Sequence, residues 1–153
     1  RARVLGHLAA NGIDDVAVLT GDIHSSWAMD LAPDPFGAGY DATTGRGALA
    51  VEFVTPSVTS PGVAKAEEAD ARAREALAGH PHMRYVELIT HGYVLLDIDR
   101  ERLQGEFWHM NTIERRDASE RLASAWLTER GANHLVAARG ASAPSDAREP
   151  APG

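Results

Sequence analysis

Short strand-like runs, separated by Gly- and Pro-rich turns, recur along most of the chain. RYVELIT and YVLLDID meet at His91-Gly92, and the alternating run EFWHMNTI follows a polar turn. Alternation of apolar and polar residues predicts strands with one buried face. DVAVLT is a continuous apolar run, which indicates a strand buried on both faces, and WAMDL and ALAVEFV predict two more strands. We therefore predict a β-rich fold of the α/β (α+β) class.

Two segments carry helical patterns, and a third is ambiguous. Near the start, Val4, Leu5 and Leu8 share one helical face, and Gly12 is placed to end that helix. The Ala-rich, charged segment 63–79 predicts a helix with one face in solvent. Segment 121–138, RLASAWLTERGANHLVAA, fits either a helix to Arg130 or a hairpin that turns at residues 131–133, and the turn residues favour the hairpin.

Composition limits the class of protein. The chain has 153 residues, of which 44% are hydrophobic and 24% charged, which suits a single globular domain. A net charge of −7 argues against a nucleic-acid-binding surface, and no apolar run approaches the length of a transmembrane helix. The chain has no cysteine and no signal-peptide pattern. We expect residues 1–138 to form the domain and residues 139–153, which lack bulky apolar side chains, to form a disordered tail.

The motif LTGDIHSSW follows the first predicted strand and places Asp22 two residues before His24. In an extended segment, side chains two residues apart point to the same side, so these two would converge while Ile23 turns to the core. Gly21 would permit a sharp bend before them. A carboxylate and a neutral imidazole suit a mixed oxygen and nitrogen site for iron, zinc or manganese. The alternative is that Asp22 caps a turn and His24 is an ordinary surface residue.

Three stretches taken together resemble a known family. TGDIHSSWAMDL, then VEFVTPSVTSPG, then HMRYVELITHGYVLLDIDRERLQGEFWHMNTI are similar to the C-terminal part of PhoD-like alkaline phosphatases, which belong to the calcineurin-like metallophosphoesterases. The resemblance runs from about residue 16 to residue 136. It implies part of an αββα sandwich, and hydrolysis of phosphate esters by a metal-activated water.

The resemblance also implies roles for particular residues. Asp22 and His24 match the last metal-ligand motif of the family, and the ions that it implies are iron and calcium, with zinc or manganese as alternatives. Ser25 and Ser26 follow this pair directly. Together with Ser57 in TPSVTS and His91 between two strands, they are candidates to contact substrate or to support the metal ligands. Each of these four residues also has an ordinary structural explanation.

The earlier ligand motifs of the superfamily have no counterpart in this chain. The resemblance therefore implies a C-terminal third that is inactive alone and has the N-terminal part of the same domain as its partner. It also suggests that the whole protein is exported to the periplasm or the cell exterior. Two alternatives are a haloacid-dehalogenase-like phosphatase, because of VLTGD, and a non-catalytic β-rich accessory or binding domain.

Overall fold

The computed structural model describes residues 1–62 and 65–143. Its helices are α1 (Ala2–Asn11) and α2 (Ala66–Gly79). Its strands are β1 (Ala17–Thr20), β2 (Ser26–Leu31), β3 (Ala50–Val54), β4 (Met83–Glu87), β5 (Gly92–Ile98), β6 (Arg102–Met110), β7 (Glu120–Glu129) and β8 (Val136–Ala137). The first two residues of the predicted helical segment 63–79, and residues 144–153 of the predicted tail, lie outside the described residues.

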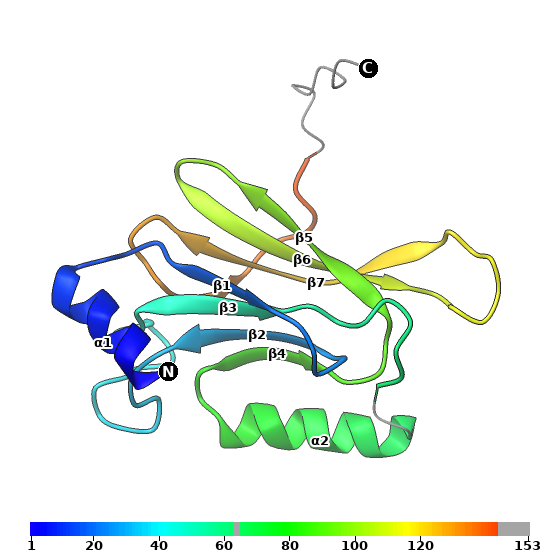
Figure 1. The fold of residues 1–153 in the computed structure, drawn as a ribbon, viewed down its shortest axis with the longest axis horizontal. Coiled ribbons are helices and arrows are strands. Elements are labelled where there is room, and N and C mark those ends of the chain that lie inside the picture. Colours follow the sequence, from blue (N-terminus) through cyan, green and yellow to red (C-terminus); the bar gives the residue numbers. More distant parts are fainter. Residues whose placement is uncertain (63–64, 144–153) are drawn as a thin grey trace.

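The strands form two four-stranded sheets. Sheet A has the order β1-β3-β2-β4, with β1 parallel to β3 and the other neighbours antiparallel. Sheet B has the order β5-β6-β7-β8 and is antiparallel throughout. The sheets lie one above the other in Figure 1, with α2 below sheet A and α1 at one end of it. The fold is therefore of the predicted mixed α/β class.

Aromatic side chains fill the space between the two sheets. The ring of Phe107 on β6 lies 6.2 Å from the ring of Phe53 on β3 and 4.9 Å from that of Tyr85 on β4, measured between centroids. A Cβ atom added to Gly105 would lie 2.3 Å from the Phe53 ring. Only glycine permits so close an approach, so Gly105 fixes how near β6 comes to sheet A.

Helix α2 covers the outer face of sheet A, and α1 packs against the same sheet at one end. Ala69 of α2 packs with Val86 and Leu88, and Leu5 and Leu8 of α1 pack with Ala50. No helix covers the outer face of sheet B within residues 1–62 and 65–143. Across these same residues, no helix is both long and apolar enough to traverse a membrane.

Two details of the predicted burial are wrong. Val4 is exposed, although it was grouped with Leu5 and Leu8, because α1 meets the sheet along a strip narrower than the apolar pattern suggests. Strand β1 is not buried on both faces, and Leu19 is 58% exposed. The reason is position, since β1 lies at the edge of sheet A and has only β3 beside it among the described strands.

The ambiguous segment 121–138 is a hairpin, as favoured from the sequence. Strands β7 and β8 pair antiparallel. Gly131 and Asn133 in their connection have φ angles of 76° and 51°. Such left-handed conformations suit glycine and asparagine, which explains why the chain turns here rather than continuing as a helix.

The start of the predicted tail is bound to sheet B. Ser142 donates to Oε1 of Glu106 through its backbone N (2.5 Å) and its Oγ (2.7 Å), and the Gln104 amide donates to the Gly140 carbonyl at 2.9 Å. Glu106 is only 2% exposed. Burial alone would raise the pKa of Glu106, but the hydrogen bonds from Ser142, Trp108 and Gln104 outweigh it and lower that pKa below its usual value. Contacts with sheet B therefore continue past residue 138, as far as Ser142.

Candidate functional site

The Asp22 and His24 motif lies at one end of the strands of sheet A. Strands β1 and β3 run parallel and both terminate at this end, where β2 begins and β4 also terminates. Three connections therefore meet: residues 21–25 between β1 and β2, residues 55–62 after β3, and residues 88–91 between β4 and β5. Connections gathered at the end of parallel strands are a common location for binding sites in α/β proteins.

The motif is a tight turn and not the extended segment that was predicted. Asp22 and His24 have φ angles of 75° and 55°, and Ile23 is 56% exposed rather than turned to the core. The topology explains the difference. Because β3 lies between β1 and β2, the chain must change direction sharply before it enters β2. Left-handed backbone costs a non-glycine residue about 1–2 kcal/mol, and strain of this kind concentrates at functional sites.

His24 is held by a backbone carbonyl. Its Nδ1 lies 2.9 Å from the Pro61 oxygen, in the connection after β3. A carbonyl oxygen can only accept a hydrogen bond, so this ring nitrogen carries the hydrogen. Nε2 of the neutral ring is then left with its lone pair, which is the arrangement that metal-ligating histidines usually show.

Asp22 is exposed, and its carboxylate has no hydrogen bond or ion pair with any other residue that the structure describes. A carboxylate and the free Nε2 of His24 on one turn fit the donor set of a mixed oxygen and nitrogen metal site. They supply only two ligands. Within the described ranges, no group of three or more His, Cys, Asp or Glu side chains is placed to hold an ion.

Two of the four other candidates, Ser57 and His91, lie next to this turn. Nε2 of His91 is 3.0 Å from the Ser60 oxygen, one residue before the carbonyl that binds His24. The Ser57 hydroxyl donates to the same Ser60 oxygen at 2.5 Å, and the Gly92 N–H donates to the Ser57 carbonyl at 3.1 Å. The structure therefore brings His24, Ser57 and His91 together around residues 57–61.

Ser25 and Ser26 point into the protein. They are 4% and 0% exposed. The Ser25 hydroxyl donates to the Ile23 carbonyl at 3.2 Å and accepts from Nε1 of Trp27 at 2.7 Å. The Ser26 hydroxyl is 3.1 Å from Nε2 of His109 in the interior. The Ser25 hydroxyl therefore ties the turn to β2, and the Ser26 hydroxyl ties the start of β2 to β6.

One buried polar cluster was missed at the sequence level. The Asp30 side chain is fully buried, and its Oδ2 accepts hydrogen bonds at 2.7 Å from Tyr40, Arg84 and His134. Burial, and next the hydrogen bond to Asp30, raise the pKa of Tyr40. The signal was present in WAMDL, because Asp30 lies in phase with buried Ala28. The cluster ties β2 to β4 and to two long connections, and so stabilises the frame behind the motif.

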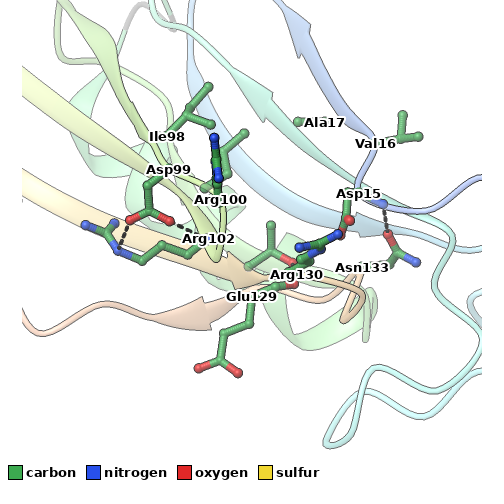
Figure 2. Close-up of a pocket in the computed structure, with 12 residues that line it drawn as sticks. Asp15, Val16, Ala17, Ile98, Asp99, Arg100, Arg102, Glu129, Arg130 and Asn133 are labelled. Atoms are coloured by element: carbon green, nitrogen blue, oxygen red, sulfur yellow. Dashed lines mark hydrogen bonds and ion pairs between the residues drawn. The ribbon is translucent and has the colours of Figure 1, made fainter.

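A cavity of about 150 Å³ opens at the opposite end of β1. Figure 2 shows its wall, where Asp15 and Asn133 face the turn between β5 and β6. Three arginines and three carboxylates line it. They are Asp15, Asp99, Arg100, Arg102, Glu129 and Arg130. Because these charges balance, the cavity does not select a ligand by charge, and it is separate from the Asp22 motif.

Comparison with known proteins gives concordant results. A family model described as "PhoD-like phosphatase" matches residues 1–107. "Alkaline phosphatase D" of Bacillus subtilis (strain 168) is 33% identical over 85 residues, which are 56% of this chain and 13% of that protein.

A solved structure, "Structure of PhoD", superposes with a TM-score of 0.75 at 24% identity over 92% of this chain and 25% of that one. The chain thus spans about a quarter of the solved relative. At this level of identity the superposition supports the fold, and the family-model match covers well over half of the sequence. The chain belongs to the PhoD-like phosphatase family.

Proposed function

We propose that this chain is the C-terminal part of a metal-dependent PhoD-like phosphatase that hydrolyses phosphate esters, and that Asp22 and His24 are two of its metal ligands. The observation that carries the proposal is the turn itself. It holds an exposed carboxylate and an imidazole with a free Nε2 in strained backbone at the end of β1. The family relationship supplies the reaction class.

The chain's own residues would have distinct tasks in this site. Asp22 would supply a hard anionic oxygen and His24 a neutral nitrogen, a combination that suits iron, zinc or manganese, while calcium would favour the carboxylate. Ions bound there would lower the pKa of a bound water and neutralise charge on the phosphoryl oxygens. Ser25 and Ser26 would keep the turn in place from below, through Trp27 and His109.

We further propose that the remaining ligands come from the N-terminal part of the same domain, so that this chain alone is inactive. Two ligands do not close a metal site, and the described residues offer no third beside them. Export of the whole protein stays a prediction of the resemblance.

The test uses the full-length parent protein and four variants. Asp22→Ala and His24→Ala are compared with Asp70→Ala and His7→Ala, which remove the same side chains from exposed helical positions. Metal content per molecule and turnover of a simple phosphate ester are measured for each. We expect the first pair to lose metal and at least about 100-fold in kcat/KM, since even the groups that support metal ligands are worth 10–100-fold.

The controls should retain both metal and turnover. Unchanged metal content in both Asp22→Ala and His24→Ala would contradict the proposal and favour a non-catalytic role for this turn. Turnover by the purified 153-residue chain with added iron and calcium would contradict the claim that it is inactive alone.

A further inference from the structure

Two histidines from different connections hold the same short piece of backbone. The Ser60 and Pro61 carbonyls are adjacent in sequence, and each contacts a separate imidazole. Nδ1 of His24 lies 2.9 Å from the Pro61 oxygen, and Nε2 of His91 lies 3.0 Å from the Ser60 oxygen. The contacts use different ring nitrogens, and this difference has a chemical consequence.

A neutral imidazole carries one hydrogen, and a carbonyl oxygen cannot donate one. His24 must therefore be the Nδ1–H tautomer when neutral, with the lone pair on Nε2. By the same reasoning His91 must be the Nε2–H tautomer, with its lone pair on Nδ1. Neighbouring groups, and not the ring itself, choose between these forms.

The backbone between the two rings is tightly fixed. The Ser57 hydroxyl binds the Ser60 oxygen at 2.5 Å, and the Gly92 N–H binds the Ser57 carbonyl at 3.1 Å. A Cβ atom added to Gly62 would lie 2.9 Å from the Leu88 oxygen and 3.2 Å from the His24 oxygen. The carbonyl that faces His24 is thus positioned by contacts on both sides of it.

We propose that His91 is a positioning residue: through Ser60 it holds the Pro61 carbonyl where that carbonyl locks His24 as the Nδ1–H tautomer and leaves Nε2 available for a ligand. His91 donates its Nε2–H to the Ser60 carbonyl, so this nitrogen does not compete with His24 for an ion. The tautomer lock stands on the geometry alone. Its consequence for metal affinity rests on the proposed function.

The first experiment needs no variant. Long-range ¹H–¹⁵N correlation spectra of the ¹⁵N-labelled chain, at about pH 8 where an ordinary histidine is neutral, report the tautomer of each ring. We expect Nδ1–H for His24 and Nε2–H for His91. His7 is an internal reference, because the Asn11 amide lies 3.2 Å from its Nδ1 and favours Nε2–H. An Nε2–H spectrum for His24 would overturn the proposal.

The second experiment separates positioning from simple packing. In His91→Ala the Ser60 carbonyl loses one of its two donors and keeps only the Ser57 hydroxyl, and we expect His24 to become a mixture of tautomers. His91→Gln keeps an amide donor and should retain the Nδ1–H form. If His91→Ala leaves the His24 spectrum unchanged while near-UV circular dichroism shows a native fold, His91 has no positioning role.

The third experiment is done on the full-length parent, with metal dissociation constants as the readout. His91→Ala should weaken metal binding about 10–100-fold, and His91→Gln should restore most of it. The two proposals fail differently. If His24 shows the expected tautomer but both Asp22→Ala and His24→Ala keep their metal, the proposed function is wrong and the tautomer assignment is unaffected. If His24→Ala loses metal but the wild-type tautomer is Nε2–H, the lock is wrong and the ligand assignment stands.

Discussion

Both ends of strand β1 have non-glycine residues with left-handed backbone, but the side chains of these residues are engaged differently at the two ends. The non-glycine residues with positive φ are Asp15 and Asn133 at its start, and Asp22 and His24 at its end, among the residues that the structure describes. All four are of types that tolerate left-handed backbone better than most. The backbone conformation alone therefore does not distinguish the two ends.

Their side chains do distinguish them. At the start, the Asp15 N–H donates to Oδ1 of Asn133 (3.0 Å), the Gly131 N–H donates to Asp15 (2.5 Å), and the Asn133 amide donates to Asp14 (2.9 Å). At the end, the Asp22 carboxylate and Nε2 of His24 have no such partner within the described ranges. At the start of β1 the side chains of the strained residues are hydrogen-bonded, and these bonds join β1 to the β7–β8 connection. At its end the strained residues leave a carboxylate and an imidazole nitrogen free, which marks a candidate site.

The largest effect should come from exchanging Asn and Asp at the two ends. Asn133→Asp removes the amide that donates to Asp14 and places two carboxylates together, so we expect a loss of roughly 2–3 kcal/mol in the free energy of unfolding. Asp22→Asn should change it by no more than about 0.5 kcal/mol. Urea unfolding of the purified chain measures both. Similar losses at the two positions would remove the distinction.

Glycine substitutions should have opposite signs at the two ends. Asp22→Gly relieves left-handed strain and breaks no described contact, so we expect a gain of about 0.5–1 kcal/mol in unfolding free energy. Asp15→Gly relieves the same strain but loses the hydrogen bond from Gly131, for a net loss of about 1 kcal/mol. Thermal unfolding would show whether the melting temperatures move apart. A loss in both variants would mean that the motif turn stores no strain.

Acid should loosen the motif end of sheet A. Burial lowers the pKa of His109, which contacts Ser26 beneath the turn. At acidic pH the folded state therefore binds fewer protons than the unfolded chain, whose histidines titrate at about pH 6.5. The contribution of neutral His109 to the free energy of unfolding is complete above that pH. It declines as the pH falls toward the lowered pKa of folded His109.

Hydrogen exchange at the start of β2, corrected for intrinsic rates, should accelerate below about pH 6.5. His109→Gln should reduce that dependence. His82→Gln is the matched control, because burial also lowers the pKa of His82 but its carbonyl contacts Asp30 at the other end of β2. Acid-independent exchange at Ser26 would contradict this assignment.

The smallest effect should come from a site far from both ends. Arg72 and Glu68 form an exposed ion pair on α2, with 3.3 Å between the charged atoms. We expect Arg72→Ala to lower the unfolding free energy by no more than about 0.5 kcal/mol. Urea unfolding of this variant gives the change in unfolding free energy that an ordinary surface substitution causes. Smaller differences between variants at the two ends of β1 are not interpretable. A larger loss would show that α2 is more sensitive than its exposure suggests.

Local chemistry carried most of the fold prediction. The charges of residues 66–79 and the turn residues Gly131 and Asn133 each indicate their element without reference to distant residues. The burial of Leu19 was misjudged because edge position in a sheet depends on strand order, which an apolar run does not encode. Most of the strand pattern was thus readable, and the exposure of a given strand was not.

The sequence supplied the candidate residues of the site but not the shape of the turn that carries them. Residue type indicates Asp22 and His24 as candidates. Their left-handed backbone follows from the order of the strands, because the connection from β1 to β2 must pass the end of β3, which lies between them. The Pro61 carbonyl that orients His24 belongs to the backbone. Backbone carbonyls are present at every residue, so no sequence pattern marks the one that is used.

The contact between Ser142 and Glu106 has a practical meaning for anyone shortening this protein. A truncation chosen from composition would stop near residue 138 and remove two donors from a carboxylate that is 2% exposed. Gln104 and Trp108 would still donate to this carboxylate, so the expected cost is that of the lost hydrogen bonds, and a hydrogen bond to a charged group typically contributes about 1.5–3 kcal/mol. An expression boundary beyond Ser142 keeps these donors.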